Sequence, residues 1–492
     1  MNNKVQLITY IDRLSADGIR GLTKLFAGPL AGVFGGAHLL PFYDAFDGAD
    51  AGFDPRDHTA IDPRLGTWND LAALGKCIEL MADLIVNHIS SESPQFKDYS
   101  QHGASSPYAS MFLTYDKVFP HGATEAELLR IYRPRPGLPF THAKLDCGQE
   151  KLLWTTFTPQ QIDIDVTHPQ SKAYLDSILA RFHNAGIRAI RMDAVGYAIK
   201  KAGTSCFMID DTFDFITELT ERAHALGIEV LVEVHSYFKR QVEIARKVDW
   251  VYDFALPPLI LHTLYSADVT ALMRWLAVRP GNAINVLDTH DGIGIIDVGA
   301  DETGNPGLLQ PSQIDSLVET IHARSHGESL QATGAAANNL DLYQVNCTYF
   351  DALGKDEALY LIARALQLFI PGIPQIYYMG LLGGTNDMAL LARSRIGRDI
   401  NRHYYSEQEV ASALRRPMVK KLIELIRLRN SHPAFNGKCA IESDAAHALS
   451  IRWETEADAI TLRVDLTAPK ASIEYTSQPA HTRTIVLISP EQ

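Results

Sequence analysis

The sequence predicts an α/β protein, a (β/α)₈ barrel with two inserted subdomains and a small antiparallel β domain at the end of the chain. Short apolar runs alternate with helical patterns through most of the 492 residues, which is typical of parallel strands buried on both faces. Two long stretches rich in turn residues interrupt this alternation. Beyond Pro433 the pattern changes to a period of two, as in an antiparallel sheet.

Eight apolar runs are the strand candidates, and most of them are followed by a helical pattern. The runs are residues 5–10, 36–42, 81–86, 190–195, 229–235, 251–256, 283–288 and 374–380. The helical patterns are residues 15–26, 68–80, 173–185, 212–226, 357–369 and 419–429. Eight βα units of this kind make a closed barrel.

The two interruptions divide the barrel. We expect the barrel to comprise residues 1–87, 167–291 and 350–435. Residues 88–166, after the third strand, are rich in Pro, Gly, Ser and aromatic residues, and a structureless loop of that length is uncommon, so an inserted subdomain is expected. Residues 292–349 form a second insertion after the seventh strand. Residues 436–492 form the C-terminal β domain, with period-two runs at 450–453, 460–464 and 484–488.

Composition excludes several classes of partner. The net charge of −13 argues against nucleic acid or an anionic membrane. The five cysteines lie far apart without metal-ligand spacing, which favours reduced thiols in a cytoplasmic protein. The first ten residues run into a strand pattern without the apolar region of a signal peptide, and no apolar stretch approaches the roughly 20 residues of a membrane span. We therefore expect a soluble cytoplasmic protein.

The fourth strand carries the first candidate for chemistry. Arg191 and Asp193 are two residues apart, so in a strand their side chains point to the same face. An Arg that keeps a carboxylate ionised and oriented is what a nucleophilic Asp requires. A structural ion pair that caps the following helix is the alternative, and the pair alone does not decide between them.

Further polar side chains at the ends of other strands favour the catalytic interpretation. Asn87 and His88 follow the third strand, Glu233 ends the fifth, and His290 and Asp291 follow the seventh. Polar residues at the carboxyl ends of barrel strands are the catalytic candidates of this fold. The apolar neighbours Val232 and Val234 are expected to raise the pKa of Glu233, as suits a general acid. An ionised Asp beside a protonated Glu is the arrangement of a retaining glycosidase.

At these residues the sequence resembles the α-amylase superfamily and, within it, the sucrose phosphorylases. The superfamily matches are 83–88, 191–193, 233 and 290–291; the longer, phosphorylase-like matches are 46–55, 132–140, 202–208, 339–344 and 397–402. The resemblance extends from the first strand to the last barrel helix and fades after Pro433.

The resemblance implies a role for each matching residue. Asp193 would be the nucleophile, Glu233 the acid/base and Asp291 the stabiliser of the transition state. The residues expected to enclose one glucose are Asp50, Phe53, His88, Arg191, His290 and Arg398. The residues expected to line a site shared by fructose and phosphate are Tyr132, Pro134, Arg135, Tyr197, Phe207, His235, Leu340, Asp341, Tyr343 and Gln344.

The reaction implied is reversible phosphorolysis of sucrose by inorganic phosphate to α-D-glucose 1-phosphate and fructose. It would proceed with retention through a β-glucosyl-enzyme, with transglucosylation and slow hydrolysis as side reactions. Fructose and phosphate would occupy one place in turn, so the acceptor loop in the second insertion is expected to move, with 334–337 as its hinge and Arg135 as the phosphate anchor. A rigid insertion with Arg135 in solvent is the alternative. A homodimer remains open.

Departures from the superfamily bear on metal binding. The pattern Gln-Pro-Asp-Leu-Asn of related transglucosidases is replaced by residues 161–165, Gln-Ile-Asp-Ile-Asp, and Thr289 stands where many amylases carry Asn. These changes argue against an amylase-type calcium site, so no metal and no cofactor is expected.

Other functions stay open within the same fold. Related phosphorylases act on glucosylglycerate, glucosylglycerol or sucrose 6'-phosphate, and a hydrolase or transglucosidase would not need phosphate at all. A non-catalytic barrel would lack the carboxylates. The segments 132–140 and 340–344 favour sucrose, because the resemblance assigns them to the acceptor site.

Overall fold

The computed structural model describes residues 1–44, 50–133, 137–301, 304–334, 344–477 and 481–488. Its centre is a closed barrel of eight parallel strands in the order β1-β16-β13-β12-β11-β10-β5-β2. The strands are β1 Gln6–Thr9, β2 Gly36–Leu39, β5 Glu79–Ile85, β10 Ala189–Asp193, β11 Glu229–Val232, β12 Trp250–Asp253, β13 Ala283–Asn285 and β16 Ile373–Tyr377. Each of these strands overlaps one of the eight predicted runs, so the predicted barrel is confirmed.

Helices surround the barrel. They are α2 Gly18–Ala27, α3 Trp68–Leu74, α7 Pro169–Asn184, α8 Asp210–His224, α9 Phe238–Ala245, α10 Leu256–Ser266, α11 Thr270–Leu276, α15 Glu357–Phe369 and α19 Pro417–Ser431. Local sequence sets several of their ends. Pro169 occupies the first turn of α7 after the cap His168, where its missing N–H costs nothing. Asp356 caps α15 by accepting from the N–H groups of Ala358 and Leu359.

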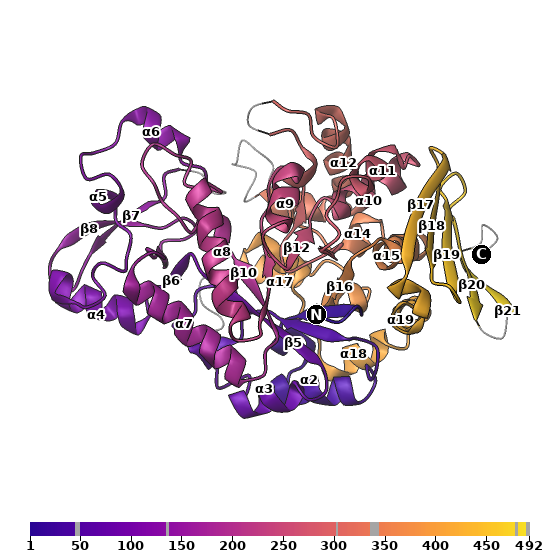
Figure 1. Cartoon of the computed structure of the whole chain (residues 1–492), viewed down its shortest axis with the longest axis horizontal. Helices are drawn as coiled ribbons and strands as arrows, with labels where there is room; N and C mark the ends of the chain where they lie inside the picture. The colour runs from indigo at the N-terminus through magenta and orange to yellow at the C-terminus, as the bar shows by residue number, and fades with distance from the viewer. Residues whose placement is uncertain (45–49, 134–136, 302–303, 335–343, 478–480, 489–492) are drawn as a thin grey trace.

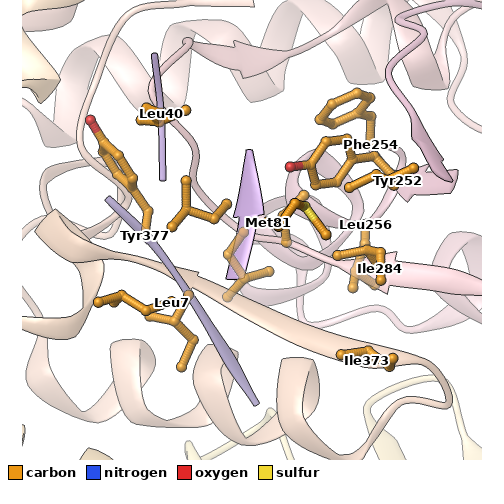
Figure 2. Close-up of a cluster of buried hydrophobic side chains, with 14 of the residues drawn as sticks. Leu7, Leu40, Met81, Tyr252, Phe254, Leu256, Ile284, Ile373 and Tyr377 are labelled. Carbon is orange, nitrogen blue, oxygen red and sulfur yellow. The ribbon is translucent and has the colours of Figure 1, made fainter. Parts of the chain in front are cut away.

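Apolar side chains fill the barrel. Figure 2 shows Leu7, Met81, Ile284, Ile373 and Tyr377, which come from the four strands β1, β5, β13 and β16, gathered in one buried cluster. Strands that are apolar on both faces can fill the interior and still bind the surrounding helices. A hydrogen-bonded set of His38, Tyr252 and Gln375 from β2, β12 and β16 is buried as well, and the candidate polar side chains lie further along, at the carboxyl ends of the strands.

The region after β5 forms a lobe on one side of the barrel (Figure 1). Its elements are β6 His88–Ser90, α4 Pro94–His102, α5 Tyr115–Val118, α6 Glu125–Arg130, β7 Phe140–Lys144, β8 Glu150–Trp154 and β9 Gln161–Asp163. Leu113, Phe119 and Trp154 form a small core of their own with Cys206, which comes from the loop after β10. The exact bounds of this inserted subdomain, residues 88–166, stay a proposal.

The second insertion and the loops at the strand ends contain short elements. After β2 come β3 Tyr43–Asp44 and β4 Asp57–Ile61; before these, α1 spans Ile11–Leu14. After β13 come β14 Ile293–Gly294, α12 Pro311–Arg324, α13 Glu328–Gly334, β15 Gln344–Val345 and α14 Tyr349–Ala352. After β16 come α16 Tyr378–Leu381, α17 Met388–Ser394 and α18 Glu407–Ala413.

The C-terminal domain is one five-stranded antiparallel sheet on the opposite side from the lobe (Figure 1). Its strands are β17 Lys438–Ala445, β18 Ala448–Glu454, β19 Ala459–Asp465, β20 Lys470–Ser477 and β21 His481–Ile488. The three predicted runs lie in β18, β19 and β21. The sheet attaches to the barrel where Trp453 Nε1 donates to the carbonyl of Phe369 at 2.7 Å.

The cysteines and the helices bear on the expected location of the protein. All five cysteines lie in described residues and are unpaired. Across the described ranges, the helices are too short or too polar to cross a membrane.

Candidate active site

Arg191 is the centre of the candidate site. Its side chain is 2% exposed, and its guanidinium contacts three carboxylates. Nη1 lies 3.1 Å from Asp193 Oδ1 and also contacts Asp83, whereas Nη2 lies 2.8 Å from Glu233 Oε1. The contact with Asp193 confirms the expectation that the two side chains share one face of the strand.

Barrel register brings these carboxylates together. Arg191 is paired with Asp83 on β5, and Met192 is paired with Val232 on β11. Asp193 and Glu233 therefore end adjacent strands, and the N–H of Ala194 donates to Glu233 Oε2 at 3.3 Å. Ala194 has φ 53°, a left-handed conformation that costs a non-glycine residue about 1 kcal/mol or more. Such strain directly after a candidate nucleophile is typical of functional sites.

The surroundings of Glu233 differ from the predicted ones. β11 ends at Val232, so Glu233 lies just beyond the strand, and its apolar chain neighbours are not its only surroundings. The carboxyl instead contacts the Arg191 guanidinium and the Ala194 N–H.

The charge state of Asp193 also differs from the expectation. Burial raises the pKa of the Asp193 carboxyl, Arg191 opposes this, and Glu233 and Asp83 raise the pKa further. Arg191 alone was expected to keep Asp193 ionised, but its single charge is shared among three carboxylates. At Asp83, burial acts to raise the pKa, but Arg191 and His38 outweigh it and hold the pKa at about 2. The pKa of Asp193 is therefore set by the whole group of neighbouring carboxylates, and not by Arg191 alone.

Asp291 has the opposite electrostatics. Its Oδ1 lies 2.8 Å from Arg398 Nη1 and 3.8 Å from Arg402 Nη2. Burial opposes ionisation, but these guanidinium groups hold the pKa of Asp291 well below its usual range. Asp291 is therefore a fixed negative charge at the end of the barrel.

The residues expected to enclose glucose lie together around these carboxylates. The ring of Phe53 stacks on His290 with centroids 4.9 Å apart, and the Phe53 carbonyl lies 2.8 Å from His88 Nε2. Arg398 Nη1 is 4.0 Å from Asp50 Oδ1. Burial lowers the pKa values of His88 and His290, so both rings are neutral near pH 7. Neutral imidazoles and carboxylates are suitable partners for sugar hydroxyls.

The residues expected at the acceptor site are described in part. Tyr132, Tyr197 and Phe207 form an aromatic cluster, in which the Phe207 ring lies 4.6 Å from Tyr132 and 4.7 Å from Tyr197. His235 Nε2 lies 3.3 Å from the Gln344 side-chain nitrogen. The other predicted acceptor residues lie outside the described residues; they are Pro134, Arg135, Leu340, Asp341 and Tyr343. Most of the expected hinge, residues 335–337, is also outside them.

Sequence reasoning did not single out Lys200. Its ammonium is buried and lies 2.6 Å from Asp163 Oδ2 and 2.5 Å from Asn87 Oδ1, and it also contacts the carbonyl of Tyr197. It joins the lobe, through β9, to the ends of β5 and β10. The unusual segment around Asp163 was the available signal, because Lys200 lies between Tyr197 and the segment 202–208 without belonging to either.

Glu233, His235 and Asp291 are side chains of the kind that bind metals, and their nearest ligand atoms all lie within 4.8 Å of one another. Each already has a partner: Arg191, Asp297 and Arg398, respectively. A metal ion would face two guanidinium groups, so we do not regard these residues as metal ligands. The absence of a metal stays a prediction.

Comparison with known proteins agrees with this geometry. The family model for the α-amylase catalytic domain matches residues 33–245. A sucrose phosphorylase from Agrobacterium vitis is 59% identical over 473 residues, which cover 96% of this chain and 97% of that protein. The chain belongs to the sucrose phosphorylase family.

A second member of the family, from Bifidobacterium adolescentis, is 51% identical over 99% of both chains. Among solved structures, the sucrose 6F-phosphate phosphorylase from Thermoanaerobacter thermosaccharolyticum superposes with a TM-score of 0.91 at 35% identity, covering 99% of this chain and 98% of that one. The sucrose phosphorylase relatives extend over the C-terminal domain as well, where the sequence resemblance alone faded.

Proposed function

We propose that the protein catalyses the reversible phosphorolysis of sucrose to α-D-glucose 1-phosphate and fructose. The conclusion rests on the sequence identity of 59% and 51% to two sucrose phosphorylases over nearly the whole chain. The arrangement of Asp193, Glu233 and Asp291 at the strand ends supports it, because retaining glycoside chemistry needs a nucleophile and a proton donor on either side of the anomeric carbon.

In the first half-reaction, Asp193 attacks the anomeric carbon of the glucosyl unit while Glu233 donates a proton to the departing fructosyl oxygen. The C–O bond to fructose breaks as the ester bond to Asp193 forms. We assign the donated proton to Glu233, because its side chain stands at the end of the strand next to that of Asp193. The fixed charge of Asp291 stabilises the positive charge that develops on the sugar ring.

In the second half-reaction, a phosphate oxygen attacks the same carbon, the bond to Asp193 breaks, and Glu233 takes the proton of the incoming phosphate. We propose that Tyr132, Tyr197, Phe207, His235 and Gln344 line the acceptor place. Arg135 is proposed as a phosphate-binding cation, with Pro134, Leu340, Asp341 and Tyr343 completing a loop that moves between the two half-reactions.

Incubating the purified protein with sucrose, with and without phosphate, tests the function. We expect glucose 1-phosphate as the main product with phosphate and slow release of free glucose without it. Free glucose as the main product under both conditions would indicate a hydrolase.

Closely related phosphorylases differ in the leaving group, as the solved structure of a sucrose 6F-phosphate phosphorylase illustrates. Phosphorolysis of sucrose 6'-phosphate, glucosylglycerol or glucosylglycerate in preference to sucrose would identify the protein as one of these. We also propose a cytoplasmic location without nucleic-acid or membrane partners, from the charge of −13 and the unpaired cysteines. Light scattering would test whether the protein forms a homodimer.

A further inference from the structure

Asp297 is a buried carboxylate next to the acceptor place with no role assigned so far. It lies in the short 3-10 helix η3, Ile296–Val298, and is 0% exposed. Its Oδ1 accepts from the N–H of Ser236 at 3.1 Å and from Gln241 Nε2 at 2.9 Å, and its Oδ2 lies 2.9 Å from His235 Nδ1. All three neighbours can donate, so the group is bound as an ionised carboxylate.

A buried carboxylate needs a positive partner, because leaving its charge uncompensated costs several kcal/mol. Among the described residues, Asp297 forms its ion pair with His235. The ring of His235 stacks on Phe254 with centroids 3.8 Å apart, which fixes its plane. Burial acts to lower the pKa of His235, but Asp297, with help from Glu233 and Asp291, raises it above its usual value.

The ring of His235 lies next to the reaction site. A nitrogen of His235 and carboxylate oxygens of Glu233 and Asp291 lie within 4.8 Å of one another. Phosphate that enters beside these carboxylates meets negative charge, and the two nearby guanidinium groups of Arg191 and Arg398 are already in contact with carboxylates. A second cation that points at the acceptor, in addition to the proposed Arg135, would offset the negative charge on this side.

We propose that Asp297 is a positioning residue that holds His235 as an imidazolium, which then donates a hydrogen bond from Nε2 to the incoming phosphate. This inference rests on the proposed function. Gln344 fits this role, since its amide lies 3.3 Å from His235 Nε2 and can turn its oxygen toward a protonated ring until phosphate arrives.

A glycine makes room for the pair. A Cβ atom on Gly294 would lie 2.4 Å from Asp297 Oδ2 and 3.2 Å from His235 Nδ1. A side chain at this position would push the carboxylate away from the ring. Gly294→Ala therefore disturbs the pair without removing either charge.

Asp297→Asn tests the proposal chemically. Ser236 N–H and Gln241 Nε2 fix the oxygen of the new amide, so its NH₂ group must face His235 Nδ1. That arrangement favours a neutral ring with Nδ1 unprotonated. We expect the apparent KM for phosphate at pH 7 to rise at least tenfold, whereas kcat for sucrose hydrolysis without phosphate falls less than threefold. The phosphate KM should recover as the pH is lowered and the ring is protonated again.

Asp253→Asn is the matched control. Asp253 is similarly buried, accepts two neutral hydrogen bonds, from Leu256 N–H and Trp275 Nε1, on Oδ1, and pairs with Arg279 on Oδ2. None of these three partners is assigned to the site. Its replacement should leave the ratio of the two KM values for sucrose and phosphate unchanged. Equal loss of both half-reactions in Asp297→Asn, or an unaltered phosphate KM, would overturn the proposal.

A measurement on the wild-type protein keeps the test independent of folding. The rate of hydrogen exchange at the imidazole C2 position of His235, followed by mass spectrometry across pH, reports the pKa of that ring. We expect a value above the ordinary one, and a value at or below it would also overturn the proposal. If the wild-type protein forms no glucose 1-phosphate from sucrose, the proposed function fails, whereas a normal wild-type reaction with an unchanged Asp297→Asn variant rejects only this inference.

Discussion

Arg191 Nη1 lies 3.1 Å from Asp193 Oδ1, a contact made between alternate residues of one strand. The same guanidinium holds Asp83 and Glu233, so it cannot neutralise Asp193 by itself. Its effect is to orient three carboxylates in one buried place. Orientation of this kind is what a displacement at a single carbon requires.

Replacing Asp193 by Ala should abolish turnover, because no covalent glucosyl intermediate can form. We expect less than about one part in a thousand of wild-type activity with sucrose, measured as glucose 1-phosphate release. The variant should unfold at the same or a higher temperature, since the replacement removes a buried carboxyl that burial itself disfavours in its charged form. Activity well above that level would reject Asp193 as the nucleophile.

Glu233→Gln should separate substrates by their leaving groups. Sucrose needs a proton on the fructosyl oxygen, so its cleavage should fall by at least about a hundredfold. Glucosyl fluoride needs little assistance, so its reaction with Asp193 should persist. Parallel kinetics with both donors measure this difference, and equal losses would give Glu233 another role.

The glucose pocket should accept one terminal glucosyl unit. Arg398 lies 4.0 Å from Asp50 and 2.8 Å from Asp291, so these side chains form a polar wall next to the catalytic carboxylates. A wall built to pair with hydroxyls excludes longer chains, because misfitting sugar leaves buried polar groups unpaired. We expect no measurable sugar release from maltodextrins, and Arg398→Ala should raise the KM for sucrose at least tenfold. Efficient degradation of maltodextrin by the wild-type protein would contradict this.

Much of the fold followed from local pattern. All eight barrel strands could be predicted because apolar runs such as 190–195 are bounded by clear helices. β17 and β20 were not predicted, because in strands such as Lys438–Ala445 most side chains are partly or fully exposed and the apolar alternation is weak. Tertiary pairing with β18 and β19 makes them strands.

Of the candidate active site, the sequence pattern alone predicted the residues that stand at strand ends. Asp193, Glu233 and Asp291 stand at such ends, and the glucose set followed through the family resemblance. The shared charge of Arg191 was not predictable, because it depends on the register that places Asp83 beside Arg191. Asp297 comes from a short 3-10 helix and Lys200 from an irregular segment, and only the folded chain creates their contacts.

Lys200→Met should destabilise the protein strongly. The variant removes the cation from a buried set of oxygens and leaves Asp163, which is 0% exposed, without that partner. Loss of one member of such a pair costs about 3–5 kcal/mol. Lys201→Met is the matched control, because Lys201 is exposed and its contact with Asp211 is worth less than about 1 kcal/mol. Thermal unfolding of the two variants measures the difference, and similar melting temperatures would show that Lys200 is not a structural cation.

Acidification should destabilise the protein in part through His58. This residue of β4 is 1% exposed, its ring packs 4.1 Å from that of Tyr43, and its Nε2 lies 3.3 Å from the carbonyl of Asp83. Burial, only partly offset by Asp83, lowers the pKa of His58 to about 4. Between that value and the ordinary pKa near 6.5, the unfolded chain binds a proton that the folded one does not, so stability is full above about pH 6.5 and falls as the pH decreases. From pH 6.5 to 5 this amounts to about 2 kcal/mol.

His58→Phe keeps an aromatic ring in this place and removes the titration. We expect its melting temperature to fall less between pH 7 and pH 5 than that of the wild-type protein, as scanning calorimetry can measure. His142→Gln is the control, since His142 is well exposed and its replacement should leave the pH dependence as it is. If His58 causes part of the acid destabilisation, its removal must make the dependence of stability on pH weaker between pH 7 and pH 5. The same acid-induced decrease in wild type and His58→Phe would therefore mean that other groups cause it.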